Sequence, residues 1–324
     1  MYKKNLIYTS TLKLTKNEWL ANRLLGIGGS EIGTILGKNP YFSSIELFYQ
    51  KLGLQPMGIV DNEATFWGRH LESQVAEKWQ YWDGSVESYL KNYNLKERKR
   101  RCWKINAIVR NPKYPQLSAN IDRMFKGGIL ECKTISGWAV KQWETGIPPM
   151  YIYQIQQYML ILEENRAEIA ILQDGRNFNV HKFVADSAIQ EEIIVASDKF
   201  WNKVVDARKR MGELTDANKI MAVVHELEPE PDGTEAYEKF LNEQFKSSDI
   251  DDTIKSTEQD IEWARKYKWF GGAEKRANSI KIEYSSRLKK KLLENNASKM
   301  DCGQYGKISW GKSGLRVNVN FDEC

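Results

Sequence analysis

Two β-prone segments in the middle of the chain constrain the fold more than any other feature. Residues 116–125 and 129–135 are apolar runs of strand length, and Lys126-Gly127-Gly128 separates them. Gly-Gly between two such runs is a strong signal for a tight antiparallel hairpin. We therefore expect a hairpin that turns at Gly127-Gly128 and lies in a central sheet. The helical patterns on both sides of it indicate an α/β or α+β domain.

Alternation along this hairpin separates a charged face from an apolar face. Side chains of a strand point alternately to opposite faces, so Glu131 and Lys133 share one face while Cys132 points to the other, into the core. A turn at Gly127-Gly128 places Asp122 opposite Lys133 on the neighbouring strand. Two carboxylates and one amine are thus predicted to converge.

This group has the composition of a magnesium site. Mg²⁺ prefers a few carboxylates together with water and phosphate oxygens, which predicts Asp122, Glu131 and the backbone carbonyl of Cys132 as ligands of one or two ions. Lys133 would orient or deprotonate an attacking water, and the cation would stabilise the charge that develops on a phosphoryl group. An ordinary polar hairpin face is the alternative that spacing alone leaves open.

Histidine and cysteine are too few and too scattered for other common chemistries. The chain has 3 His and 4 Cys, with no CxxC pair and no His pair at metal-ligand spacing, which argues against a zinc hydrolase, a His-based triad and a disulfide framework.

No run approaches the roughly 20 apolar residues of a membrane span, and the N-terminal segment lacks the apolar region of a signal peptide. We expect a cytoplasmic protein, and the net charge of +5 is a weak indication of a polyanionic partner.

Helical periodicity and composition divide the chain into three predicted parts. Residues 1–212 form a core with a central mixed sheet flanked by helices, the acidic and proline-containing segment 213–233 is a linker, and residues 234–324 are a mainly helical extension that ends in a β-hairpin. The helices expected in the core lie within 15–53, 62–82, 149–163 and 187–210, and a second hairpin joins 168–172 to 177–184 through an Asp-Gly turn.

A set of motifs surrounds the central hairpin in a characteristic order. Asp122 is followed nine residues later by Glu131-Cys132-Lys133, with Ile121 rather than Pro before the aspartate. The flanking motifs are Trp19 and Arg23 before Gly26-Ile-Gly-Gly-Ser30-Glu31-Ile-Gly, then Gly68-Arg-His-Leu-Glu72, then Trp143, Gly146, Pro148 and Tyr151 before Gln154-Ile-Gln-Gln-Tyr158. Over roughly residues 15–165 the chain resembles the YqaJ and phage lambda exonuclease family of the PD-(D/E)XK nuclease superfamily.

The resemblance implies a fold and an activity. The fold would be restriction-endonuclease-like. The activity would be that of a Mg²⁺-dependent alkaline exonuclease, with Mn²⁺ able to substitute, which digests one strand of double-stranded DNA from its 5′ end. The 3′ single-strand tail would pass to an annealing protein of the RecT type, and family members often form a trimeric ring. Such a protein would be encoded by a phage or prophage and work in the cytoplasm of a bacterial host. A structure- or site-specific endonuclease and an inert DNA-binding protein remain the alternatives.

The resemblance also assigns roles to individual residues. Glu72 would add a carboxylate to the catalytic group and the metal site, and a surface carboxylate on its helix is the alternative. Gln154 and Tyr158 would line the site, and their spacing of four fits core packing as well. Arg23 and Ser30 would hold the 5′ phosphate, with Ser30 also predicted as an N-cap.

A basic segment and one tryptophan complete the predicted DNA-binding residues. The segment carries Lys96, Arg98, Lys99, Arg100 and Arg101, whose contacts to phosphates would be independent of DNA sequence. A solvated loop is the alternative for this segment. Trp143 could stack on a frayed base or lie in the core.

Overall fold

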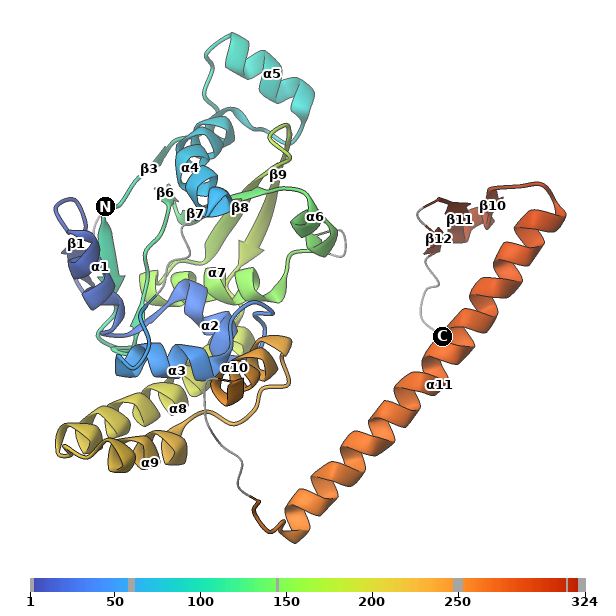
Figure 1. Ribbon diagram of the computed structural model, residues 1–324. Helices are drawn as coiled ribbons and strands as arrows, with labels where there is room; N and C mark the ends of the chain where they lie inside the picture. Colours follow the sequence, from blue (N-terminus) through green and yellow to red (C-terminus); the bar gives the residue numbers. More distant parts are fainter. Residues whose placement is uncertain (1–2, 58–61, 144–145, 247–252, 313, 320–324) are drawn as a thin grey trace. The chain divides into compact units, whose positions relative to one another are not determined.

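The chain divides into two compact units. The computed structural model describes residues 3–57, 62–143, 146–246, 253–312 and 314–319, without the side chains of residues 138 and 141. Clustering of contacts separates Met1–Asp249 from Ile250–Cys324 (Figure 1). Each unit is described by itself below.

A five-stranded mixed sheet forms the centre of the first unit, with the strand order β3-β6-β7-β8-β9. Its strands are β3 (Cys102–Trp103), β6 (Arg123–Phe125), β7 (Gly128–Ile135), β8 (Arg166–Gln173) and β9 (Asn177–Val184). The strands β7 and β8 are parallel, and the other neighbours are antiparallel. The helix α7 (Pro149–Leu162) lies in the crossover that joins the parallel pair. The predicted central mixed sheet flanked by helices is confirmed.

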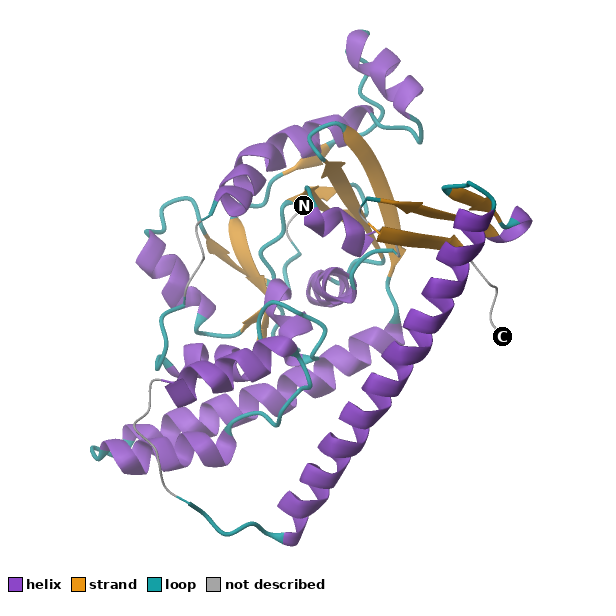
Figure 2. Ribbon diagram, turned by 45° about the vertical axis from the view of Figure 1, so that its right-hand side comes forward, coloured by secondary structure: helices purple, strands orange, loops and turns teal. Residues whose placement is uncertain are grey.

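Helices cover both faces of this sheet. On one face, α4 (Glu63–Tyr81) packs Val75 and Trp79 against Leu130 and Cys132. Figure 2 shows helices on both sides of the sheet. On the other face, α7 contributes apolar side chains to the larger core, which also contains Ile129 of β7. Alternation along β7 therefore sends odd-numbered residues towards α7 and even-numbered residues towards α4, as the sequence predicts for Cys132.

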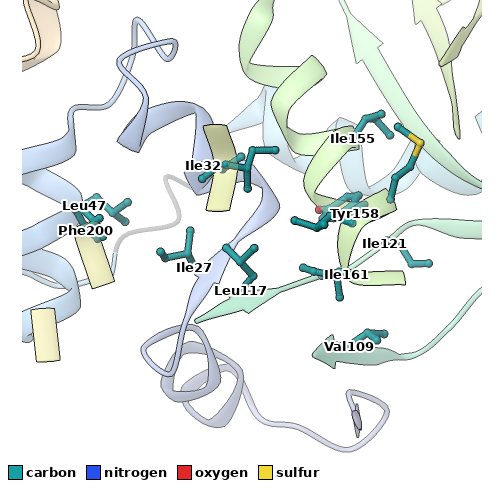
Figure 3. Close-up of a cluster of buried hydrophobic side chains, with 14 of the residues drawn as sticks. Ile27, Ile32, Leu47, Val109, Leu117, Ile121, Ile155, Tyr158, Ile161 and Phe200 are labelled. Carbon is teal, nitrogen blue, oxygen red and sulfur yellow. The ribbon is translucent and has the colours of Figure 1, made fainter. Parts of the chain in front are cut away.

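The remaining elements of the first unit are two short strand pairs and a set of helices. They are the pairs β1 (Ile7–Ser10) with β4 (Ala107–Arg110) and β2 (Ile27–Gly28) with β5 (Leu117–Ser118), and the helices α1 (Lys16–Arg23), α2 (Gly29–Ile35), α3 (Ser44–Leu52), α5 (Val86–Asn94), α6 (Trp138–Trp143), α8 (Ser187–Gly212), α9 (Ala217–Leu227) and α10 (Glu235–Lys246). Most of them contribute apolar side chains to the main core, part of which is drawn in Figure 3, whereas Tyr89 of α5 stacks on Phe178 of β9. The predicted helices at 62–82, 149–163 and 187–210 and the hairpin of β8 and β9 are confirmed, whereas α5 is a helix that the predicted set does not include.

The central hairpin turns one residue earlier than predicted. Phe125 pairs with Gly128, so the two-residue turn is Lys126-Gly127, with Gly127 at φ +78°. Gly128 is a strand residue, and a Cβ there would lie 2.4 Å from the ring of Phe125 and 2.8 Å from the carbonyl of Arg166. Gly128 therefore allows Phe125 and the backbone of β8 to pack closely against β7. The turn was predicted one residue too late because Gly128 directly follows Gly127, and a Gly-Gly pair is typical of a turn.

The unit boundary lies later in the chain than residue 212. The segment predicted as a linker contains α9, whose Val224 is fully buried in the core of the first unit. Further along, Phe240 of α10 packs edge-on against Tyr49 of α3 at 5.3 Å between ring centroids. Only the acidic, proline-containing stretch between α9 and α10 is irregular, and apolar contacts on both sides hold it to the first unit.

The second unit consists of one long helix and a small sheet. Its elements are α11 (Glu258–Glu294), β10 (Lys299–Asp301), a single 3₁₀ turn η1 (Gly303–Tyr305), β11 (Gly306–Gly311) and β12 (Gly314–Val319). The antiparallel pair of β11 and β12 confirms the predicted terminal hairpin, and β10 adds a third strand. In the described ranges, no helix combines the length and apolar character that crossing a bilayer requires.

Candidate active site

Asp122 and Glu131 lie close together on the two arms of the central hairpin, Asp122 just before β6 and Glu131 in β7. Asp122 directly precedes β6, and its Oδ2 accepts the backbone N–H of Cys132 at 2.8 Å. Glu131 is only 3% exposed, and its Oε1 accepts from Lys133 Nζ at 2.6 Å and from Gln154 Nε2 at 2.9 Å. Its other oxygen, Oε2, is buried and has no hydrogen-bond partner among the described residues. A buried carboxylate oxygen without a partner is costly and calls for a cation or a donor from outside the chain.

Gln154 and Tyr158 of α7 belong to a chain of hydrogen bonds that reaches the Glu131 carboxylate. Gln154 Nε2 also donates to the Tyr158 hydroxyl at 3.0 Å, and that hydroxyl donates to the carbonyl of Asn120 at 3.1 Å. The ring of Tyr158 is 4% exposed and lies in the core near Ile121 (Figure 3). Lining the site and packing in the core, the two alternatives for Gln154 and Tyr158, are therefore compatible. The ring of Tyr158 packs in the core, while the polar atoms of both residues face the carboxylates.

The charges of the site are unbalanced in the absence of a cation. Burial, reinforced by the negative charge of Glu131, raises the pKa of Asp122 to about 8, and Lys133 opposes this only in part. Burial would lower the pKa of Lys133, but the carboxylates of Glu131 and Asp122 more than offset it, so the pKa of Lys133 is raised. Lys133 is therefore protonated at neutral pH, and one positive charge faces two carboxyl groups.

These residues fit a hard divalent cation. The unpaired oxygen of Glu131 and the raised pKa of Asp122 both indicate a missing positive charge next to oxygen ligands. Within the described ranges, no three or more His, Cys, Asp or Glu side chains group as a metal site, so water and phosphate oxygens would have to complete the coordination. Of the predicted metal ligands, Asp122 and Glu131 converge; for Cys132 the prediction concerns the backbone carbonyl, and its side chain packs on the opposite face of β7.

Glu72 is engaged with basic residues. Its carboxylate forms ion pairs with Arg123 and with Lys104, the latter at 3.2 Å. Arg123 in turn donates to the backbone carbonyl of Asp122 at 2.6 Å, so it connects α4 to the strand that carries the aspartate. Sequence reasoning missed Arg123, although its position directly after Asp122 on a half-buried strand was an available signal.

A cavity of about 150 Å³ connects the carboxylates to the residues predicted to hold a 5′ phosphate. Its lining residues come from α1, the β2–α2 connection, the approach to β6, β7 and α7. They are Trp19, Asn22, Arg23, Gly28, Gly29, Ser30, Ile108, Ser118, Asn120, Asp122, Glu131, Gln154 and Tyr158. Residues separated by more than a hundred positions in the sequence thus open onto one space.

Comparisons with known proteins assign this chain to a family. A model described as the YqaJ-like viral recombinase domain matches residues 18–165. The uncharacterized protein YqaJ of Bacillus subtilis (strain 168) is 30% identical over 271 residues, which cover 82% of this chain and 74% of that protein. The chain belongs to the YqaJ family.

Solved structures with lower similarity to this YqaJ-family protein include an alkaline exonuclease from Laribacter hongkongensis. It is 17% identical, covers 61% of this chain and 97% of its own, and has a TM-score of 0.48. The same exonuclease in complex with dAMP gives 18% identity over the same shares of the two chains and a TM-score of 0.49.

Arg23 of this YqaJ-family protein is held by a buried ion-pair network. Its guanidinium lies 2.5 Å from Oε1 of Glu31, and Oε2 of Glu31 accepts from Lys51 Nζ at 2.8 Å. The Lys51 side chain is fully buried and also donates to the carbonyls of Arg23 and Gly26, each at 2.7 Å. Glu31 and Lys51 thus fix both the backbone and the side chain of Arg23 at the wall of the cavity.

Ser30 lines the same cavity, although it is not an N-cap. The helix α2 begins at Gly29 with Gly28 as its N-cap, and the Glu31 carboxylate accepts the Gly28 N–H at 2.8 Å. The prediction that Ser30 caps a helix from Glu31 is therefore wrong by two residues, because Gly28 already has the extended capping conformation and the helix begins at Gly29. Gly29 is required there, since a Cβ would lie 2.2 Å from the ring of Tyr158.

The basic segment 96–101 of this YqaJ-family protein is divided between surface and interior. Lys96, Arg98, Lys99 and Arg101 are exposed, and Lys99 pairs with Glu97 at 3.3 Å. Arg100 instead lies over the ring of Trp79 and forms an ion pair with Glu168 at 2.7 Å. Arg100 is therefore not one of the exposed positive charges of this segment. It connects α4 to β8 instead.

Trp143 packs within the first unit. Its ring stacks on Tyr151 at 5.1 Å between centroids, and it is partly buried against the main core. Tyr151 in turn lies under Lys133, whose Nζ is 4.9 Å from the ring centroid. Trp143 is thus connected to Lys133 through Tyr151 and does not contact it directly.

The raised pKa of Asp122 predicts a pH dependence of stability. In metal-free protein the folded state holds a proton on Asp122 up to pH of about 8, while the ordinary value is 3.8, so the contribution of this group to stability falls as the pH rises between those values. Asp122→Asn removes this pH-dependent loss of stability, because the amide of Asn does not titrate. With chelator present, we expect the variant to melt at least about 3 °C above the wild type at pH 8 and close to it at pH 4. Differential scanning calorimetry at both pH values tests this, and an equal difference at both would contradict it.

Proposed function

We propose that this YqaJ-family protein is a Mg²⁺-dependent exonuclease that digests one strand of double-stranded DNA from its 5′ end and leaves a 3′ single-strand tail. One observation carries the proposal: the buried, unpartnered oxygen of Glu131 lies beside Asp122 in a cavity that also holds Arg23. This combines an acidic cation site with a cationic anchor for a phosphate, which is the pairing that hydrolysis next to a phosphorylated DNA end needs.

Asp122 and Glu131 would hold one or two Mg²⁺ ions, or Mn²⁺ in their place. When bound, the cation supplies positive charge to the phosphoryl group as negative charge develops on it. The raised pKa of Lys133 makes it a proton donor and a point charge rather than a base at neutral pH, so its role would be to orient the attacking water and the scissile phosphate. Gln154 and Tyr158 would keep the Glu131 carboxylate in place.

Arg23 and Ser30 would select the 5′ end. Both residues line the cavity shared with the carboxylates, and the Arg23 guanidinium is well suited to a phosphate because it offers several N–H donors in one plane. Exposed Lys96, Arg98, Lys99 and Arg101 would add contacts to the duplex that depend on salt rather than on sequence. The partners proposed with this activity are a RecT-type annealing protein and two further copies in a trimeric ring.

A time course on linear duplex DNA, labelled separately at each end, tests the proposed function. With Mg²⁺ we expect release of mononucleotides from the 5′ ends, and no release with chelator. Discrete large fragments would indicate an endonuclease on the same core. Binding of DNA without any cleavage would indicate an inert DNA-binding protein, and either result overturns the proposal.

Arg23→Gln tests the proposed origin of the polarity. The change removes the charge at the cavity wall and retains hydrogen-bonding capacity, so initiation on 5′-phosphorylated ends should fall roughly 10- to 100-fold, as expected for the loss of 1.5–3 kcal/mol from a charged hydrogen bond. Initiation on 5′-hydroxyl ends should change much less. Arg101→Gln, on the exposed basic segment, serves as the matched control and should weaken both ends equally. An equal loss on both ends for Arg23→Gln would remove its proposed role.

A further inference from the structure

The long helix α11 carries an exposed apolar stripe. Trp263, Tyr267, Phe270, Ile280 and Tyr284 are between 54% and 86% exposed. Ala273 and Ala277 fill the gap between Phe270 and Ile280, so apolar residues recur every three or four positions over six turns of helix. This spacing places them all on one side of α11.

Such a stripe is unusual on a helix exposed to water. Near the C-terminal end of α11, Leu292 is 1% exposed and Lys289 lies over the ring of Trp310 in β11, so the small sheet covers that end. The stripe lies on the preceding turns of the helix, which Figure 2 shows as one continuous element. Large exposed apolar patches of this kind generally mark sites of association.

We propose that α11 pairs in antiparallel orientation with α11 of a second copy of this chain. The apolar residues of the stripe are spaced almost symmetrically about residue 275. Antiparallel pairing about that point places Phe270 against Ile280 of the second copy and brings Tyr267 within one residue of the position that faces Tyr284. Ala273 then faces Ala277 of the second copy, so the small residues meet at the centre, where the helices can approach most closely.

Charge complementarity selects the antiparallel orientation. The first turns of α11 carry Glu258, Asp260 and Glu262, and the last turns carry Lys289, Lys290 and Lys291. An antiparallel pair brings the acidic end of each helix to the basic end of the other. A parallel pair would place like charges together at both ends, which is unfavourable.

The available area is sufficient for a stable pair. Each copy offers the aromatic rings of Trp263, Tyr267, Phe270 and Tyr284, and an aromatic side chain can bury roughly 150–250 Å². Two such helices therefore reach the roughly 1,000 Å² that specific interfaces exceed. The contact would have two-fold symmetry, so it is separate from the three-fold ring of the proposed function.

Single-stranded DNA is a less suitable occupant of the same face. Aromatic rings and lysines can bind a single strand through stacking and charge. However, the stripe continues through alanine and isoleucine, which do not stack on bases, and Glu274 and the acidic first turns would repel phosphates. A second copy accounts for both the apolar continuity and the acidic residues.

A pair of matched substitutions tests the stripe in the full-length protein. Phe270→Asp places a charge at the centre of the proposed interface, whereas Ile282→Asp places the same charge on the other side of the helix, at a residue that is 58% exposed. In sedimentation velocity experiments over a range of concentrations, Phe270→Asp should raise the dissociation constant of the pair at least ten-fold, and Ile282→Asp should leave it within two-fold. Equal effects of the two variants, or none from Phe270→Asp, would overturn the proposal. Weaker binding of an oligo-dT strand by Phe270→Asp with unchanged association would overturn it in favour of DNA.

Disulfide cross-linking tests the orientation. In a background with Cys302→Ser and Cys324→Ser, Lys266→Cys and Tyr284→Cys proteins are oxidised separately and as a mixture. Antiparallel pairing predicts a cross-linked product in the mixture only, because position 266 faces position 284 of the second copy. Products from each protein alone would show parallel pairing, and no product in any sample would exclude the interface.

Discussion

Glu131→Gln is expected to reduce DNA digestion roughly 10²- to 10³-fold or more, while the protein remains folded. The substitution keeps the shape of the side chain and the amide contact from Gln154, but it removes the negative charge that Lys133 balances. It also replaces the unpaired oxygen with a weaker ligand or a donor, either of which disfavours a cation. The rate of mononucleotide release from linear duplex DNA at saturating Mg²⁺ measures the effect.

A binding readout separates loss of the cation from loss of the fold. Mg²⁺ or Mn²⁺ that binds only the folded state raises Tm, so the wild type should be stabilised as the ion is added and Glu131→Gln should not. Glu213→Gln, at the exposed end of α8, removes a carboxylate outside the site and should retain both digestion and the metal-dependent shift. If Glu131→Gln keeps near-normal activity, or if the ion stabilises both proteins equally, Glu131 is not part of a metal site.

The convergence of Glu131 and Lys133 was accessible from the sequence because alternation along a strand is a local property. Glu131 and Lys133 lie two residues apart on β7, and the structure joins them directly at 2.6 Å. The partner strand was harder to place, since its register depends on which residues form the turn. Both glycines fit a turn in the sequence, and only the packing of Phe125 against Gly128 shows that the second one belongs to the strand.

Contacts between distant segments explain what the sequence could not show. Arg100 belongs to a run of basic residues, yet its partner Glu168 lies 68 positions away on β8. Lys51 sits in an amphipathic helix where lysine is ordinarily exposed, and nothing local indicates that its amine is buried among carbonyls. Charge runs and helical periodicity describe neighbours in the chain, whereas burial depends on which other segments pack there.

The largest effect on stability is expected from the buried ion pair of Glu31 and Lys51. Burial would raise the pKa of Glu31, but the positive charges of Lys51 and Arg23 prevail and lower it. A lowered carboxyl pKa contributes stability above the ordinary value of 4.5, and this stability is lost as the pH falls through the lowered pKa. Glu31→Gln should therefore cost roughly 3–5 kcal/mol at pH 7, because it leaves Lys51 buried without its counter-charge. The corresponding fall in Tm is roughly 6–20 °C.

A double-mutant cycle distinguishes this pair from an incidental contact. Lys51→Met removes the other charge, and the Glu31→Gln/Lys51→Met protein should lose less stability than the sum of the two single variants, by roughly 0.5–3 kcal/mol. Glu226→Gln breaks the exposed pair of Glu226 with Arg210 and should leave the stability nearly unchanged, because solvent and salt screen such a pair. Additive losses in chemical denaturation at pH 7 would show that the two charges do not support one another. Non-additive losses would show that the two charges support one another, in the same pair of side chains that holds the carbonyl and the guanidinium of Arg23.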